Sequence, residues 1–328
     1  MSLTRRHVLR SLAGASLALP GMLSELMAAD RVTEVGDPLA PKAFSLIAIS
    51  KHGIPNVFAE EALNEAHSVS QLPLSEDKRE DLRHLPIVAI DPADARDHDD
   101  AIWAEPDGQG GFNAVIAIAD VSFYVRPGGA LDKEARKRGN SVYFPDRVVP
   151  MLPEILSADV CSLREGQDRA AMVCHVRISG EGKVTSSHFS RAIVRIDEVI
   201  PYEQAQQRID DNNAGDNLQH LWDCWKALAA ARDARDPLEL DLPERRVILD
   251  DDGKIAEIAV RERLDAHRVV EDFMITANVA AGLNGCCHET ALTFTSALAG
   301  TGVIGRFAVV MAFTDIGAVA VCQVGGAR

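Results

Sequence analysis

Residues 90–100 are Ile90-Asp91-Pro92-Ala93-Asp94-Ala95-Arg96-Asp97-His98-Asp99-Asp100, a stretch with five carboxylates within ten residues. It follows an apolar run, residues 85–90, that predicts a buried strand. Like charges at the end of a buried strand repel one another unless a cation lies among them. Oxygen ligands with one local histidine and no cysteine suit magnesium or manganese rather than zinc. With such an ion bound, the expected chemistry is attack of water on a phosphodiester.

Two other interpretations of this stretch have to be weighed. An acidic loop is often only solvated surface, and an EF-hand calcium loop also spaces its acids closely. A calcium template that starts at Asp97 meets Ala101 at its fifth position and Ile102 where a glycine is needed, so it does not fit. Apolar residues 101–103 follow at once, and residues 114–121 predict a second strand. Acids between two core strands favour the metal site over solvated surface.

The spacing of these aspartates is similar to that of a known family. Asp91, five residues, Asp97, one residue and then Asp99-Asp100 resembles the acidic signature of the ribonuclease II/ribonuclease R family catalytic domain, the RNB domain. The resemblance continues in register through residues 118–122, 141–145, 150–163, 240–244 and 267–278. A later family segment with His, Ser, Pro and paired arginines is not found between Ala281 and Arg328. The resemblance is therefore to a partial RNB-type catalytic domain, truncated before the arginine motif.

The resemblance implies a hydrolytic 3′→5′ exoribonuclease that degrades single-stranded RNA to 5′-nucleotides. In that family the matching aspartates Asp91, Asp97, Asp99 and Asp100 hold one or two magnesium ions, with manganese as the alternative metal. Asp99 matches the residue that cleavage most needs. Because the arginine segment is missing, the alternative is a catalytically inactive RNB fragment or fusion product that at most binds RNA or metal.

Three further residues are implied as RNA contacts. Tyr143 matches a tyrosine that stacks near the 3′ end of the RNA, although it could also be an ordinary half-buried strand residue. Tyr202 and Glu271 match residues near the terminal nucleotide. Glu271 has a second interpretation as a polar residue on an amphipathic helix.

Composition limits the function classes. The 328 residues are 47% apolar, enough for one large or two ordinary domains, and the formal net charge of −15 argues against a broad nucleic-acid-binding surface. The basic run at residues 136–138 could face phosphates, but such runs are usually solvated helix ends. The six cysteines fit neither a paired zinc motif nor a disulfide scaffold, and Cys161 and Cys174 are expected to be buried. No stable protein partner is implied.

The chain divides into four predicted segments. Residues 1–30 resemble a twin-arginine export signal, with Arg5-Arg6 before an apolar stretch, or else form a short amphipathic helix. The family would place the protein in the cytoplasm; a working signal would export it. Residues 31–82 are a linker and approach segment, with a strand at 44–50 and a helix at 57–67. Residues 83–282 are the partial catalytic domain. Residues 283–328 are an apolar tail of unknown origin, in which buried strands or a non-native, out-of-frame tail are favoured over a membrane span.

The predicted fold class is α+β, a mixed β-sheet with packed helices. Strands dominate residues 166–200, with a hairpin turn at Gly180-Glu181-Gly182. Helices are expected over residues 203–232, interrupted at 210–215, and over residues 261–283. A second hairpin is expected at residues 247–258.

Overall fold

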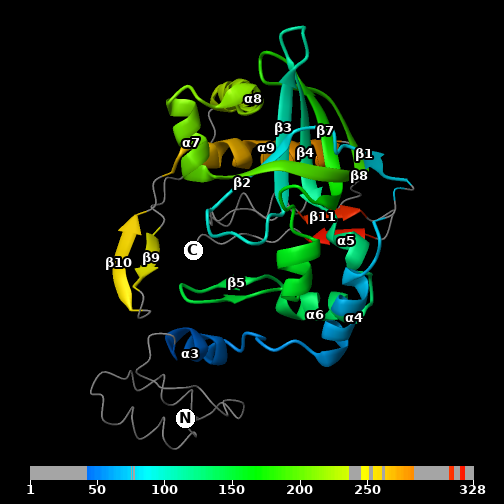
Figure 1. The fold of residues 1–328 in the computed structure, drawn as a ribbon, viewed down its shortest axis with the longest axis vertical. Coiled ribbons are helices and arrows are strands. Elements are labelled where there is room, and N and C mark those ends of the chain that lie inside the picture. The colour runs from blue at the N-terminus through cyan, green and yellow to red at the C-terminus, as the bar shows by residue number, and fades with distance from the viewer. Residues whose placement is uncertain are drawn as a thin grey trace, which may run out of the picture.

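The computed structural model describes residues 43–74, 76, 78–235, 245–250, 254–260, 263–283, 310–313 and 318–321. A six-stranded sheet with the order β1-β8-β2-β3-β4-β7 forms its centre (Figure 1). The strands are β1 (Glu80–Asp81), β2 (Ile87–Asp91), β3 (Asp100–Pro106), β4 (Phe112–Ala119), β7 (Asp168–Ile178) and β8 (Val184–Pro201). Strand β8 runs parallel to β1 and β2 but antiparallel to β7, so the sheet is mixed as predicted.

The long strand β8 closes the sheet into a barrel. Its residues 184–195 pair with β7, and its residues 196–201 pair with β2. The inner face is built from many small side chains, including Ala89, Ala101, Ala117 and Ala171, around Trp103. The outer face packs against helices, so both faces of the central strands are buried. All five residues of β2 are buried for this reason, which explains the apolar run over residues 87–90 before Asp91.

Three helices cover the outer face of the barrel: α7 (Tyr202–Asp210), α8 (Gly215–Asp233) and α9 (Asp265–Leu283). Trp222, Phe273 and Val269 from these helices pack against Ile102 and Ile116 of the sheet in one apolar cluster. A buried polar contact joins two of the helices, because the Trp225 indole N–H of α8 donates to Asp272 of α9 at 2.8 Å.

A second, smaller core lies beside the barrel. It is formed by α4 (Glu60–Ser70), α5 (Val121–Tyr124), α6 (Ala130–Arg138) and a π-helical turn η1 (Leu156–Val160). The carboxylate of Glu65 in α4 accepts the backbone N–H groups of Ala130 at 2.6 Å and Leu131 at 3.2 Å, at the start of α6. This contact fixes α4 to α6, since the first N–H groups of a helix have no partner within it.

Short elements complete the described chain. They are α3 (Ala43–Lys51), the hairpin β5 (Val142–Tyr143) with β6 (Val148–Val149), the hairpin β9 (Arg245–Leu249) with β10 (Ile255–Val260), and the hairpin β11 (Val310–Phe313) with β12 (Ala318–Val321). None of the described helices combines the length and the apolar character that crossing a membrane requires.

Most of the predicted elements are confirmed. The hairpin turn at 180–182, the interruption between α7 and α8, the hairpin β9–β10 and helix α9 all occur where the sequence predicts them. The buried state of Cys161 and Cys174 is confirmed as well. The export-signal-like residues 1–30 and much of the apolar tail lie outside the described residues.

The predicted strand at residues 44–50 is wrong, because these residues form helix α3. Ser45 and Ile49, which lie one helical turn apart, are both buried, while Phe44 is 70% exposed. Ser45 Oγ donates to Asp146 Oδ2 at 2.8 Å, next to the β5–β6 hairpin. Tertiary packing thus decides the conformation of an apolar run whose pattern fits both structures.

The basic run at the end of α6 is only partly a solvated helix end. Arg136 and Lys137 are exposed, but only 2% of the Arg138 side chain is exposed. Its guanidinium lies over the Phe58 ring, 3.6 Å from the centroid, and donates to the carbonyl oxygens of Pro55 and Pro150. Arg138 therefore has a structural role, in which it holds the segment before α4 against α6.

Gly182 is expected to tolerate no side chain. It has a φ of +73°, and an added Cβ would collide with the carbonyl oxygen of Ala227 in α8. Gly182→Ala should lower the free energy of unfolding by about 2–5 kcal/mol, from backbone strain and overpacking together. Gly166→Ala is the control, because Gly166 has a similar φ of +70° but open space around it, so only about 1–2 kcal/mol should be lost. If urea unfolding gives the same loss of free energy of unfolding for the two variants, the close approach of Gly182 to Ala227 is contradicted.

Buried thiols should make the protein less stable at alkaline pH. Burial raises the pKa of Cys174 to about 12 and that of Cys224 to about 12, whereas an unfolded thiol titrates near 8.5. Above pH ~8.5 the native state therefore binds more protons than the unfolded state, and stability falls as pH rises toward 12. Each thiol should contribute about 1.4 kcal/mol per pH unit. Urea unfolding between pH 8 and 10.5 should show that the free energy of unfolding falls less steeply with pH for Cys174→Ala than for the unmodified chain. An unchanged dependence on pH would show that the Cys174 thiol is not its cause.

Candidate active site

The acidic stretch lies at one end of the barrel, where two adjacent strands are connected. Asp91 is the last residue of β2, and Asp100 is the first residue of β3. The connecting loop carries Asp97 and Asp99, and the N–H of Ala119, at the end of β4, donates to the carbonyl oxygen of Asp99 at 2.9 Å. Three strands therefore converge on the segment that carries the predicted metal ligands.

Burial separates the predicted metal ligands from the remaining acid of the stretch. Asp91 is only 6% exposed, and Asp97, Asp99 and Asp100 are half-buried, while Asp94 is exposed. Carboxylates placed at a barrel end with little access to water are costly unless they have hydrogen bonds or a cation. The four aspartates with low exposure are therefore the same four that match the spacing of the family.

Asp91 has a histidine partner that the sequence did not single out. The distance between His98 Nδ1 and Asp91 Oδ2 is 2.7 Å, and both side chains are largely buried. Because a carboxylate accepts, the proton of this bond is on Nδ1. His98 follows Asp97 directly, so the loop folds back onto the end of β2.

Tyr143 meets one of the predicted metal ligands. It lies on β5, and its hydroxyl group donates to Asp97 Oδ2 at 2.9 Å. The two residues are 46 positions apart in the sequence. The β5–β6 hairpin is thereby held beside the acidic loop, and the predicted RNA contact and the predicted metal site are brought together.

The side chains of the other two predicted RNA contacts have partners on the helices that cover the barrel. Tyr202 is 1% exposed and stacks on the His267 ring, with centroids 4.1 Å apart, between α7 and α9. A ring so deeply buried argues against direct contact with RNA. Glu271 is half-buried on α9 and forms an ion pair with Arg263 at 2.6 Å, as expected for a polar position of an amphipathic helix. Tyr202 directly follows Pro201, the residue of β8 that pairs with Asp91 at the end of β2, so its backbone lies next to the acidic stretch although its ring is buried between the helices.

The donor chemistry of the four aspartates fits a hard divalent cation, because carboxylate oxygens are the ligands that magnesium and manganese prefer. Their side chains do not, however, converge on one point. Within the described part of the chain, no three or more His, Cys, Asp or Glu side chains are grouped so that they could hold a metal ion. The loop supplies suitable ligands, and binding would require their carboxylates to turn toward a shared ion.

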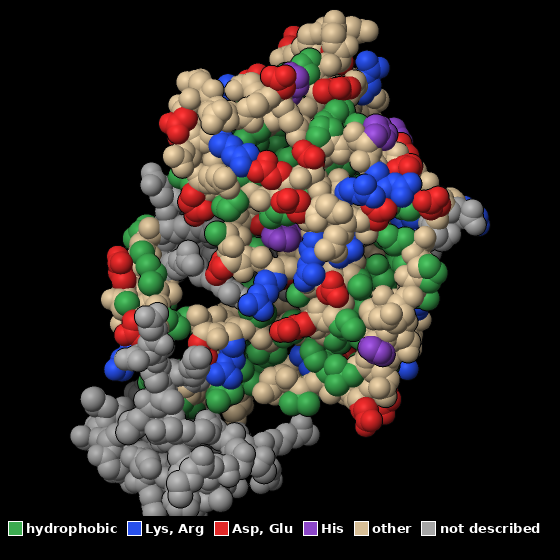
Figure 2. Space-filling view, viewed as in Figure 1, with side chains coloured by type: hydrophobic (Ala, Val, Ile, Leu, Met, Phe, Trp, Pro, Cys, Tyr) green, Lys and Arg blue, Asp and Glu red, His purple; other side chains and the backbone are tan. Residues whose placement is uncertain are grey.

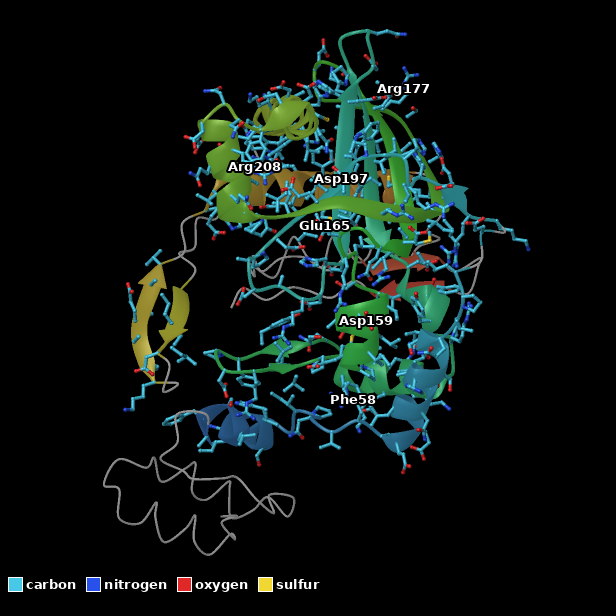
Figure 3. The ribbon with its side chains drawn as sticks, viewed as in Figure 1. Phe58, Asp159, Glu165, Arg177, Asp197 and Arg208 are labelled. Atoms are coloured by element: carbon cyan, nitrogen blue, oxygen red, sulfur yellow. The ribbon has the colours of Figure 1, made fainter. Side chains whose placement is uncertain are left out.

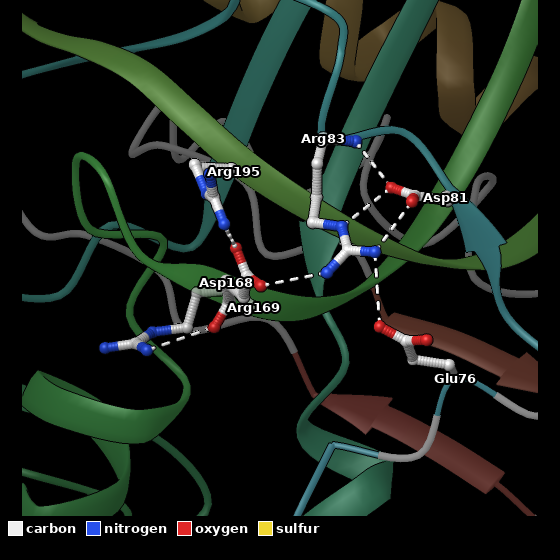
Figure 4. Close-up of polar contacts among 6 residues, drawn as sticks. All are labelled: Glu76, Asp81, Arg83, Asp168, Arg169 and Arg195. Atoms are coloured by element: carbon white, nitrogen blue, oxygen red, sulfur yellow. Dashed lines mark hydrogen bonds and ion pairs between the residues drawn. The ribbon is translucent and has the colours of Figure 1, made fainter.

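Several basic side chains near the barrel form ion pairs with acids. Figure 4 shows a surface network of Glu76, Asp81, Arg83, Asp168, Arg169 and Arg195. Arg83 donates to Asp81 and Asp168, and Arg195 donates to Asp168 at 2.7 Å. The hydrogen bonds from Arg83 hold the pKa of Asp81 well below its usual range.

Other arginines are paired in the same way. Arg177 and Arg208, labelled in Figure 3, have Asp107 and Glu198 as partners. Positive and negative side chains are interspersed over the face in Figure 2. On this face, the described basic side chains do not gather into one patch.

The hydrogen bond between Tyr143 and Asp97 should be measurable as a coupling energy. Tyr143→Phe and Asp97→Ala each remove it, so the double variant should be about 1 kcal/mol more stable than the sum of the single losses predicts. Urea unfolding of the four proteins gives this value. Strictly additive losses would mean that the two side chains do not interact in solution.

The chain matches the RNB domain over residues 79–294. It is 40% identical over 262 residues to ribonuclease R of Vibrio parahaemolyticus, covering 76% of this chain and 31% of that protein. It is 37% identical over 265 residues to ribonuclease R of Escherichia coli, covering 77% of this chain and 33% of that protein. The chain thus spans about a third of the length of these curated relatives.

Solved structures show the same fold. Ribonuclease R of Mycoplasma genitalium in complex with ribose-methylated single-stranded RNA superposes with a TM-score of 0.70 at 26% identity, covering 76% of this chain and 40% of that one. Yeast Ssd1, described as a pseudonuclease, has a TM-score of 0.60 at 17% identity, covering 76% of this chain and 32% of that one, and shows the fold alone. Its match to the RNB domain over residues 79–294, together with its sequence similarity to ribonuclease R, shows that this chain belongs to the RNB domain family.

Proposed function

We propose that this chain is a hydrolytic 3′→5′ exoribonuclease that degrades single-stranded RNA to 5′-nucleotides in the presence of magnesium. The observation that carries the proposal is the set of four buried or half-buried aspartates at the end of the barrel, in the spacing of the RNB family. Similarity to ribonuclease R, which in the Mycoplasma genitalium structure is bound to single-stranded RNA, supports the substrate class.

Asp91, Asp97, Asp99 and Asp100 would hold the metal, as the family spacing implies. When bound, magnesium or manganese would lower the pKa of a coordinated water and offset negative charge that develops on the phosphate. The low exposure of Asp91 strengthens its electrostatic interactions, because little water screens them. Asp99 is proposed as the residue that cleavage most requires.

Tyr143 is proposed to contact the 3′ end of the RNA. Its hydroxyl group donates a hydrogen bond to Asp97, so a base stacked on the ring would lie next to the acidic loop. Stacking on an aromatic ring is nearly independent of the base, which suits an enzyme that removes nucleotides of any sequence in turn.

One observation favours a second candidate function, a non-catalytic RNA- or metal-binding protein. Among the described residues, no three His, Cys, Asp or Glu side chains are grouped so that they could hold a metal ion. Such a protein would bind single-stranded RNA and leave it intact. The two candidates therefore differ in one measurable outcome, cleavage.

Asp99→Asn is the test of the catalytic proposal. The purified chain should shorten a 5′-labelled single-stranded oligonucleotide from its 3′ end when magnesium is present, and EDTA should stop the reaction. Asp99→Asn should lower the rate at least about a hundredfold, because a charge that stabilises the transition state is lost. Gel electrophoresis of the labelled products over time measures both effects.

Asp94→Asn is the matched control, since Asp94 lies in the same loop but is exposed and outside the family spacing. It should keep the rate of the unmodified chain. RNA that is bound but left intact by the unmodified chain would favour the non-catalytic candidate. Equal rates for the Asp99 and Asp94 variants would exclude Asp99 from the reaction.

A further inference from the structure

The loop that carries the aspartates has anchors outside the acidic set, and these were not apparent from the sequence. Crowded carboxylates repel one another, so a loop that holds several of them tends to open unless its backbone is fixed. Residues 92–99 belong to no helix or strand. Their conformation therefore depends on contacts with other parts of the chain.

Ser162 fixes the backbone of this loop at two points. Its hydroxyl oxygen accepts the N–H of His98 at 3.0 Å, and its hydroxyl proton is donated to the carbonyl oxygen of Arg96 at 2.9 Å. The N–H of Leu163 donates to the carbonyl oxygen of His98 at 2.7 Å. Ser162 is 1% exposed and Leu163 is fully buried, so the anchor itself is part of the core.

His98 connects this anchor to the first aspartate. Its backbone N–H and carbonyl group are held by Ser162 and Leu163, and its ring N–H is directed at Asp91 Oδ2, 2.7 Å away. Only 11% of the His98 side chain and 8% of the Asp91 side chain are exposed. A hydrogen bond in such surroundings is little weakened by water and restricts the carboxylate to one orientation.

The structure assigns His98 as the positioning residue of the metal centre, which orients the Asp91 carboxylate while Ser162 holds the loop in place. This inference rests on the function proposed above. Carboxylates that bind metals are commonly oriented by a second hydrogen-bonding group, and loss of that group typically weakens metal binding 10–100-fold. His98 acts through Asp91 and has no direct role in cleavage.

The test measures manganese binding to the purified chain by the loss of the free Mn²⁺ signal in electron paramagnetic resonance. His98→Phe keeps a ring of similar size but has no donor, and should weaken binding about 10–100-fold. His98→Asn places an amide N–H near the position of Nδ1 and should recover most of the affinity. In RNA cleavage, His98→Phe should lower kcat and leave KM for RNA nearly unchanged.

His175→Phe is the matched control, because His175 also pairs with a carboxylate, Glu80 Oε2 at 3.0 Å, but lies on β7 outside the acidic loop. It should bind manganese like the unmodified chain. Ser162→Ala, measured by hydrogen exchange without metal, should make the His98 amide exchange roughly five- to tenfold faster. Circular dichroism verifies that each variant is folded.

The outcomes separate this inference from the proposed function. If the unmodified chain binds manganese and cleaves RNA but His98→Phe does the same, the positioning role is overturned and the proposed function stands. If His98→Phe and His98→Asn bind manganese equally weakly, the N–H donor does not account for the affinity and the inference is overturned. If the unmodified chain binds no manganese at millimolar concentration, the inference fails together with the proposed function.

Discussion

The dual pairing of strand β8, with β7 along its first part and with β2 along its last part, is the constraint on which the structure depends. It closes the sheet, so the inner face of each strand must be filled by side chains and the outer face must be covered by helices. The small alanines inside and the apolar faces of α7, α8 and α9 outside both follow from this closure. Closure also fixes the end of β2 beside the start of β3, where the acidic loop begins and ends.

The crowded carboxylates of the acidic loop oppose folding, and contacts with the rest of the barrel offset part of this cost. Four aspartates with limited access to water would raise the free energy of folding if their charges had no partners. Part of this cost is offset by hydrogen bonds, from His98 to Asp91 and from Tyr143 to Asp97. Each of these bonds holds one carboxylate. The four aspartates thus supply carboxylate oxygens at one end of the barrel, and these are the ligands that a hard divalent cation prefers.

The sequence was informative where one physical rule dominates. Apolar runs that end in clustered acids located β2 and its loop, and the turn at Gly180–Gly182 located the β7–β8 hairpin. Residues 44–50 were assigned wrongly because a short apolar run fits a helix and a strand equally, and contacts such as Ser45 with Asp146 decide between them. The role of Ser162 could not be read from the sequence, since a serine 64 positions from His98 carries no local signal of that contact. The burial of Tyr202 could not be predicted either, because a match to a family motif does not say whether a side chain is buried or exposed.

Family membership and catalytic competence depend on different features of this molecule. The barrel, its covering helices and the spacing of the aspartates account for membership, and the fold alone is shared with a protein described as a pseudonuclease. Competence requires several carboxylates to share one ion, which depends on side-chain orientation within about an ångström. Orientation is set by neighbours such as His98, Ser162 and Tyr143 and not by the aspartates themselves. A chain could therefore keep every aspartate and still lose its activity through a change in the residues that hold them.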